Sequence, residues 1–260
     1  IGAGGGIGGN VAKRFAKEGF HSVLCRRSNQ HGLDDLIRGI EEEGGTASGF
    51  LINVVEPESI EECVEKVEND IGPIETLVFN LGAQVGNKSL SETSYKIFEL
   101  GWRLATFSLF RTASSVLPKM EKRGKGSFLV TTSTAAFRGN AGQHSHASAM
   151  GGRRMLCQSL NAEFASKGIH IVHILVDGMV DAPDTLGKMM GPENFEKLRK
   201  PSVINEQTIC SPLSISSVWQ KPSLKKPVIG LEQHSSIGSS KILNCCVSIR
   251  SIILFAGKDI

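Results

Sequence analysis

The residues best suited to chemistry are glycines gathered in the run GAGGGIGG at positions 2–9. They lead directly into Asn10–Gly19, whose apolar periodicity predicts a helix. Glycines in such a place let backbone N–H groups approach a pyrophosphate at the N-terminus of the helix. A glycine loop can also be a plain turn. Two spacings fit a dinucleotide site, namely Gly4, Gly6 and Gly9, or Gly2, Gly6 and Gly8.

The elements that must position this loop alternate between helix and strand as far as about residue 199. Short apolar segments predict strands, and longer periodic segments that end at glycine predict helices. The predicted strands are Phe20–Cys25, Thr46–Ile52, Glu75–Phe79, Gly126–Thr132 and Ile169–Val176. The later helices are predicted at Leu33–Glu43, Glu56–Ile71, Ser94–Lys122 and Gly142–Ser166. Pro57 is expected to lie early in the helix at Glu56–Ile71. Pro118 is expected to bend or end the helix at Ser94–Lys122.

This alternation predicts an α/β fold, a doubly wound parallel sheet with right-handed crossovers. The glycine loop should follow a buried strand, yet only Ile1 precedes it, so we expect the first strand to be missing. Residues 1–200 are predicted to form one dinucleotide-binding domain. Residues 201–260 are rich in serine and poor in acids, which predicts a divergent or poorly structured tail with one possible strand at Ser248–Phe255.

Composition excludes several classes of function. A net charge of +3 over 260 residues, with scattered basic residues, argues against a nucleic-acid partner. No apolar run approaches the ~20 residues of a membrane span. The six cysteines form no CxxC pair and the histidines have no acidic cluster beside them, so we expect no metal site. Free thiols favour a reduced, intracellular compartment, and we expect a cytoplasmic protein.

Several motifs occur in the order of one known family. Asn80-Leu81-Gly82-Ala83 follows the third predicted strand, Ser133 ends the fourth, and Asp177-Gly178-Met179-Val180 follows the fifth. With Asn53-Val54 and the glycine loop, these motifs make residues 2–199 resemble the short-chain dehydrogenase/reductase family. The resemblance implies a Rossmann fold, hydride transfer on a carbonyl or secondary alcohol, and a homo-oligomer formed by paired long helices. The dinucleotide contacts that it implies are Gly2, Gly6, Ile7, Gly8, Asn53, Val54, Asn80, Gly82 and Val180.

The end of the first predicted strand bears on the choice of cofactor. Arg26 and Arg27 stand where a site for NAD expects an acidic residue for the ribose hydroxyls. A guanidinium group suits the 2′-phosphate of NADP instead. These residues therefore favour NADP(H) over NAD(H), although two arginines at a strand exit can also be merely solvated.

The catalytic positions that the resemblance implies are mostly replaced. Ser133 fits the family serine, but His146 stands thirteen residues later in place of tyrosine, and Met150 replaces the lysine four residues after that. Ala105 stands where the relay asparagine would fall, and the only tyrosine, Tyr95, has no lysine four residues later. An imidazole, with a pKa near ~6.5, can act as general acid or base.

Three hypotheses follow for this chain. The first is a reductase in which Ser133 and His146 act on the substrate oxygen. The second is a non-catalytic dinucleotide-binding sensor or oligomer partner, and the third is an aberrant product that folds poorly. Aromatic residues of the long predicted helix fit either a core or a helix–helix interface, and they are Phe98, Trp102, Phe107 and Phe110.

Overall fold

The computed structural model describes residues 1–82, 85–176, 180–182, 187–188 and 191–199. The predicted tail, residues 201–260, and the predicted turn at residues 177–179 lie outside the described residues. The elements are α1 (Ile7–Lys17), β1 (His21–Arg26), α2 (Gln30–Glu41), β2 (Thr46–Leu51), α3 (Ser59–Asp70), β3 (Thr76–Phe79), α4 (Tyr95–Trp102), η1 (Arg103–Phe107), α5 (Ser108–Arg123), β4 (Gly126–Ser133), α6 (His144–Phe164), β5 (Ile169–Val176) and α8 (Pro192–Arg199).

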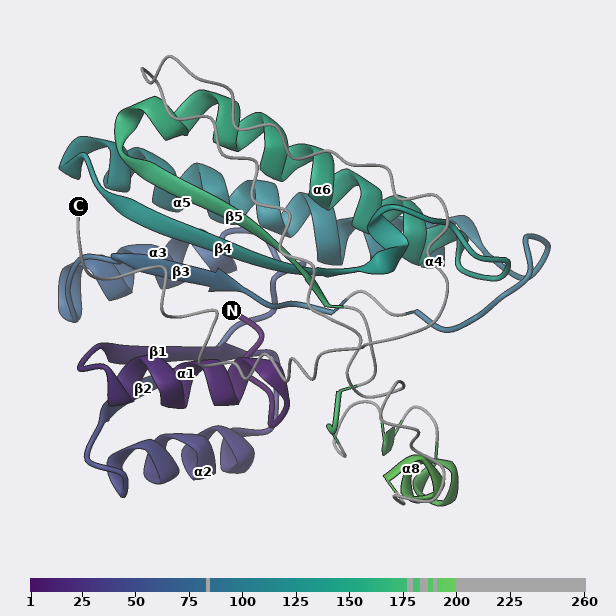
Figure 1. Ribbon diagram of the computed structural model, residues 1–260, viewed down its shortest axis with the longest axis horizontal. Helices are drawn as coiled ribbons and strands as arrows, with labels where there is room; N and C mark the ends of the chain where they lie inside the picture. Colours follow the sequence, from purple (N-terminus) through teal and green to yellow (C-terminus); the bar gives the residue numbers. More distant parts are fainter. Residues whose placement is uncertain (83–84, 177–179, 183–186, 189–190, 200–260) are drawn as a thin grey trace, which may run out of the picture.

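All described strand pairs are parallel, as the α/β prediction required (Figure 1). They form two sheets in the described residues rather than one, with the strand orders β1-β2 and β3-β4-β5. Figure 1 shows α5 and α6 along one face of β4 and β5, and α1 and α2 beside β1 and β2. The helices between successive strands are the crossovers that parallel pairing needs.

Ile1 and Gly2 together join the facing edges of the two sheets. Its amino group donates to the Val78 carbonyl at 2.8 Å, and its carbonyl accepts from the Asn80 N–H at 2.9 Å. On the other side the Gly2 N–H donates to the Cys25 carbonyl at 2.9 Å. β1 and β3 therefore lie two strand spacings apart at this level, with the backbone of Ile1 and Gly2 between them.

Each sheet has a core of its own. Leu24, Leu33 and Ile40 are the largest buried side chains in the cluster between β1, α1 and α2. A larger cluster surrounds β3, β4 and α5, where Phe79, Leu109 and Phe128 are fully buried. This core fixes the ends of β3 and β4, where the candidate site residues lie.

The helix predicted at Ser94–Lys122 is interrupted, but not where the sequence indicated. Pro118 was expected to bend or end this helix; it lies inside α5, which continues to Arg123, so it does not end it. The α-helical pattern instead changes to a π-helix at η1, five residues that include the buried Ala105. Wider π turns of this kind are frequent at functional sites.

Two predicted helix starts need correction, and one of two packing alternatives is removed. α2 begins at Gln30, earlier than predicted, because the side chain of Asn29 accepts a hydrogen bond from the Gly32 N–H and caps the helix. α3 begins only at Ser59, so Pro57 precedes the helix. The aromatic residues of the long helix were expected in a core or at a helix–helix interface, and the core alternative does not hold, since each is more than one-third exposed: Phe98, Trp102, Phe107 and Phe110.

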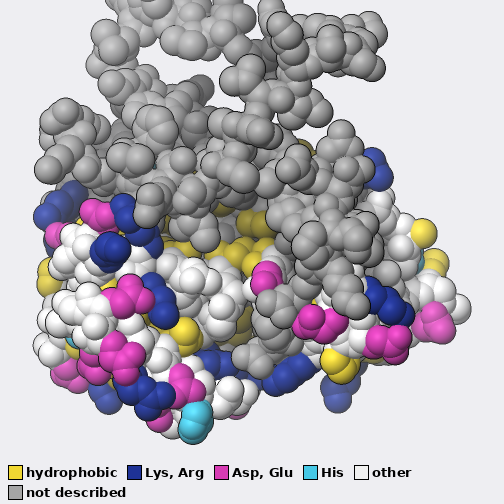
Figure 2. Space-filling model, turned by 60° about the horizontal axis from the view of Figure 1, so that its bottom comes forward, with side chains coloured by type: hydrophobic (Ala, Val, Ile, Leu, Met, Phe, Trp, Pro, Cys, Tyr) yellow, Lys and Arg dark blue, Asp and Glu magenta, His cyan; other side chains and the backbone are white. Residues whose placement is uncertain are grey.

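The surface carries no dominant charge on the face seen in Figure 2. Basic and acidic side chains are interspersed there, and apolar side chains gather in a hollow near its middle. Among the helices that the structure describes, none combines the length and apolar character needed to cross a membrane.

Candidate dinucleotide and catalytic site

The glycine loop packs tightly against the residues that follow the carboxyl end of β3 and against its own helix. Gly2 has φ +87°, and a Cβ there would stand 2.6 Å from the Asn80 carbonyl oxygen. A Cβ on Gly8 would overlap the Gly2 carbonyl oxygen. By contrast, a Cβ on Gly4 would meet nothing within 4 Å among the described residues. A Cβ on Gly9 would also stand 2.6 Å from the Gly4 carbonyl oxygen. The steric constraint therefore falls on Gly2, Gly8 and Gly9, and among the glycines of the two spacings Gly4 does not share it.

The N-terminus of α1 suits an anion. Gly6 and Ile7 begin this helix without a side-chain cap, and its first turn holds no acidic residue. The first N–H groups of a helix lack intrahelical partners and lie at the positive end of its dipole. This glycine cradle can hold the pyrophosphate of a dinucleotide, because backbone N–H groups can approach its oxygens closely.

Asn80 and Val180 hold the loop from two sides. The Asn80 amide donates to the Gly2 carbonyl at 3.2 Å and accepts from the Thr131 hydroxyl at 2.8 Å. Val180 lies beside Gly6, since a Cβ on that glycine would come 3.6 Å from a Val180 methyl group. Both predicted site residues thus position the loop. Gly82 follows β3 two residues beyond Asn80, and a Cβ there would meet nothing within 4 Å in the described part of the chain.

Arg26 ends β1 close to the start of α2. A Cβ on Gly32 would lie 2.9 Å from Arg26 Nη1, so the guanidinium group covers the first turn of that helix. Arg27 is exposed, and Asn29 turns the chain with a left-handed φ of 70°. The two predicted phosphate-binding arginines therefore lie at the carboxyl end of β1, on the same edge of the sheet as the glycine loop.

Asn53 and Val54 follow β2 and differ in their surroundings. The Asn53 amide donates to the Glu56 carboxylate at 2.8 Å, which engages the polar end of that side chain. Val54 is 5% exposed and belongs to the main core. The Val54 side chain therefore packs in the core. Any contact with an adenine would come from the exposed surface of this turn instead.

Ser133 and His146 meet, as the thirteen-residue spacing predicted. The Ser133 hydroxyl oxygen lies 3.2 Å from His146 Nε2, although the residues come from the end of β4 and the first turn of α6. His146 is 6% exposed. This pair can hold a substrate oxygen through the hydroxyl and pass a proton through the imidazole.

Met150 fills the position one turn further along α6. It is 2% exposed, and its sulfur accepts the Thr132 hydroxyl at 3.4 Å. It packs with Ala105 of η1 and Ala149 in a small apolar cluster. No described side chain in this cluster supplies the charge that a lysine would bring to this position.

Arg153 is a buried residue that the sequence analysis missed. Its side chain is 1% exposed and donates to the carbonyl groups of Ala105, Thr131 and Leu81 at 3.3, 2.8 and 2.9 Å. Its guanidinium carbon lies 5.0 Å from the centre of the Phe79 ring. Burial lowers the pKa of Arg153 to about 10, and the group stays charged at neutral pH. A charged residue spaced three positions after Met150, on the buried face of α6, was the signal that could have revealed it.

Comparison with known proteins decides the family. A family model described as short chain dehydrogenase matches residues 1–188. The chain belongs to this family. Short-chain dehydrogenases that it resembles include the 7alpha-hydroxysteroid dehydrogenase of Escherichia coli, with 27% identity over 81% of this chain and 85% of the relative. The 3-oxoacyl-[acyl-carrier-protein] reductase FabG of the same species is 29% identical over 71% of this chain and 73% of its own length.

Solved structures of short-chain dehydrogenases agree with this assignment and with the Rossmann fold. The short-chain dehydrogenase from Rhodopseudomonas palustris superposes with a TM-score of 0.65 and 29% identity, covering 78% of this chain and 92% of that protein. A 7 alpha-hydroxysteroid dehydrogenase complexed with NADH and 7-oxo glycochenodeoxycholic acid gives a TM-score of 0.65 with 26% identity, over 76% of each chain.

The loop geometry makes a prediction that separates the two glycine spacings. Gly8→Ala is expected to weaken dinucleotide binding at least ten-fold, because its methyl group overlaps the Gly2 carbonyl and must displace the cradle. Gly4→Ala is the matched control, with free space around its added methyl group. Titration of NADPH by fluorescence checks both variants. Equal loss in both would show that the register of the loop has been assigned wrongly.

Proposed function

We propose that this chain binds a nicotinamide dinucleotide, preferring NADP(H) to NAD(H), and acts as an oxidoreductase on a carbonyl or secondary alcohol. The glycine cradle at the uncapped start of α1 is the observation that carries the proposal. Structural relatives in this family are named as complexes with NADH or NADPH. The complexes with NADH and those with NADPH are both consistent with a cofactor held by the glycine loop.

In this proposal the chain contributes binding, orientation and one proton. A bound nicotinamide supplies or accepts the hydride at its C4 position. Ser133 donates a hydrogen bond to the substrate oxygen, and His146 gives that oxygen its proton during reduction or takes it during oxidation. Asn80 keeps the glycine cradle in place through the Gly2 carbonyl.

The alternative is a dinucleotide-binding protein without turnover. Met150 favours this alternative, because a buried thioether cannot carry the charge that anchors a ribose or lowers a neighbouring pKa. Titration of both nicotinamide cofactors, followed by a turnover assay with NADPH and small carbonyl compounds, distinguishes the two functions. Binding without turnover would support the alternative. A folded sample that binds neither cofactor would contradict both.

The preference for NADP(H) is testable at Arg26. Arg26→Ala should weaken NADPH binding by about ten-fold or more, since charged hydrogen bonds of this type contribute about 1.5–3 kcal/mol. NADH binding should change little, because it lacks the 2′-phosphate. Arg38→Ala is a suitable control, since Arg38 lies on α2 and already pairs with Asp35. Parallel loss of NADPH and NADH affinity in Arg26→Ala would contradict a phosphate contact.

We also propose a homo-oligomer formed through the aromatic face of α4, η1 and α5. Trp102 and Phe107 stack on this face with ring centres 5.3 Å apart, and both are exposed in the single chain. Phe110 is 51% exposed on the same long helix. An apolar surface of this kind fits a partner helix better than water.

A further inference from the structure

A turn at residues 53–56 joins β2 to α3, and we call it the β2 turn. Arg111 Nη1 donates to two of its carbonyl oxygens, those of Val54 and Glu56, both at 2.9 Å. Arg103 Nη2 donates to the carbonyl oxygen of the residue between them at 2.8 Å. Both arginines belong to the helical run of η1 and α5. Three successive carbonyl groups of the β2 turn are therefore held from one neighbouring element.

A carboxylate on α3 fixes the guanidinium group of Arg111. Arg111 Nε donates to one carboxylate oxygen of Glu61 at 2.9 Å, and Nη2 donates to the other. The Arg111 side chain is 11% exposed. The hydrogen bonds from Arg111 hold the pKa of the Glu61 carboxyl below its usual range, so this group is ionised at neutral pH. A two-pronged contact of this kind fixes the plane of the guanidinium group and directs Nη1 at the β2 turn.

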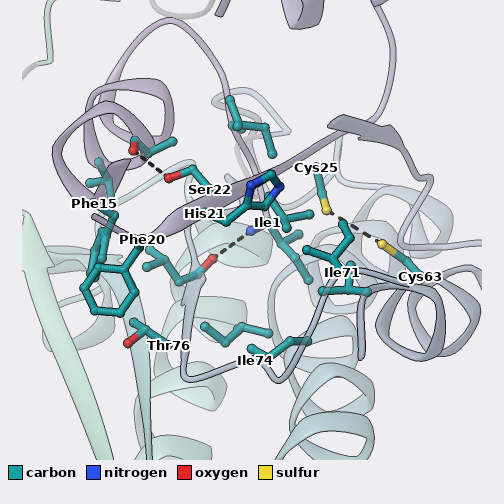
Figure 3. Close-up of a pocket in the computed structure, with 18 of the residues that line it drawn as sticks. Ile1, Phe15, Phe20, His21, Ser22, Cys25, Cys63, Ile71, Ile74 and Thr76 are labelled. Atoms are coloured by element: carbon teal, nitrogen blue, oxygen red, sulfur yellow. Dashed lines mark hydrogen bonds between the residues drawn. The ribbon is translucent and has the colours of Figure 1, made fainter. Parts of the chain in front are cut away.

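The helix that carries Glu61 is itself held by packing. Ile60, the residue before it, is fully buried in the main core. Cys63 faces Cys25 of β1, with the two sulfur atoms 3.8 Å apart (Figure 3). Glu61 therefore offers Arg111 a partner whose position is fixed by the fold.

The β2 turn lies at the edge of the sheet where we place the dinucleotide. The Ile52 N–H, directly before the turn, donates to the Arg26 carbonyl oxygen at 2.9 Å. Arg26 is the candidate contact for a 2′-phosphate, and the Cys25 carbonyl beside it accepts from the Gly2 N–H of the glycine loop. Ligands of open α/β sheets bind beyond the carboxyl ends of the strands. The β2 turn, Arg26 and the glycine loop therefore border one site.

We propose that Arg111, supported by Arg103, positions the β2 turn for the adenine ring of the dinucleotide. This inference rests on the dinucleotide binding proposed above. A turn that must be ordered on binding lowers affinity, because the cost of ordering is subtracted from the binding free energy. The two arginines order the β2 turn in advance through its carbonyl groups. They are positioning residues for the adenosine half of the cofactor.

The test measures the binding of two ligands to the full chain by calorimetry. Adenosine 2′,5′-bisphosphate carries the adenine and the 2′-phosphate without the nicotinamide, whereas NADPH carries both halves. Arg111→Met removes four hydrogen bonds and should weaken the binding of both ligands by about five-fold or more. Arg103→Met removes one bond to the turn and should weaken both by about three-fold.

Arg123 provides a matched control on the same pair of helices. It lies on α5 and donates to both carboxylate oxygens of Glu68 on α3, at 2.8 and 3.1 Å. It also donates to the Ile74 carbonyl oxygen at 3.0 Å. These contacts have the chemistry of those of Arg111, but they precede β3 instead of following β2. Arg123→Met should therefore lower the midpoint of thermal unfolding as Arg111→Met does, and should leave both affinities unchanged.

The outcomes separate a positioning role from a contribution to stability alone. Equal losses of affinity in Arg111→Met and Arg123→Met, or unchanged affinity in Arg111→Met, would overturn the proposal. So would weaker binding of NADPH with unchanged binding of the bisphosphate, because the effect would then lie in the nicotinamide half. If Arg111→Met does not fold, unchanged affinities in Arg103→Met would overturn it instead. A natural chain that binds neither ligand would contradict the dinucleotide site itself, and this inference with it.

Discussion

His146→Tyr combined with Met150→Lys is expected to raise the rate of NADPH-dependent carbonyl reduction by at least 100-fold. A positioned general acid contributes about 10²–10⁴ in rate, and its efficiency depends on a matched pKa. The lysine would add a charge beside the tyrosine at a position where Met150 now offers only a thioether to the Thr132 hydroxyl. Loss of NADPH absorbance with a panel of small ketones and aldehydes measures the effect.

Two single variants serve as controls for the double variant. Met150→Leu keeps an apolar side chain of similar size and should leave the rate unchanged. His146→Phe keeps a ring but removes the proton, so it should abolish any turnover of the natural chain. Turnover seen only in the double variant would identify the natural chain as non-catalytic. A double variant that binds NADPH yet reacts no faster would contradict the assignment of these two positions.

Arg153→Ala is expected to lower the free energy of unfolding by about 3 kcal/mol or more. The change strands the carbonyl groups of Ala105, Thr131 and Leu81, and each buried polar group left unpaired costs about 1–3 kcal/mol. It also removes the guanidinium group from the face of Phe79. Urea denaturation measures the loss, and the midpoint of thermal unfolding should fall by about 10 °C.

The neighbouring arginine supplies the control for this experiment. Arg154 lies over the ring of Phe137, which is 49% exposed, at 4.0 Å from the ring centre. Arg154→Ala should therefore cost less than about 1 kcal/mol. If both variants were equally stable, the three carbonyl bonds of Arg153 would not contribute to the fold as proposed.

The sequence predicted the strands well because each is a short apolar segment bounded by turn residues. Ile169–Val176 matches β5 in both its limits, and the end of Phe20–Cys25 differs from that of β1 by one residue. Helix starts were less accurate. Asn29 caps α2 from a left-handed conformation, which depends on how the chain leaves β1. The π-helix of η1 was not predicted, because no local pattern in the sequence indicated it.

The part of the candidate site that follows from residue spacing could be predicted from the sequence. Ser133 and His146 were brought together by the family spacing, and their side chains do meet. Arg153 was not found, because its role depends on three carbonyl groups from separate elements.

The division of the described strands into two sheets has a consequence for how the protein opens. Leu24, Leu33 and Ile40 belong to a cluster that shares no residue with the larger core around Phe128. Regions with separate packing open as separate cooperative units. Amide protons of α2 should therefore exchange with deuterium through a partial opening that leaves β4 protected, and calorimetric unfolding should depart from a single all-or-none transition.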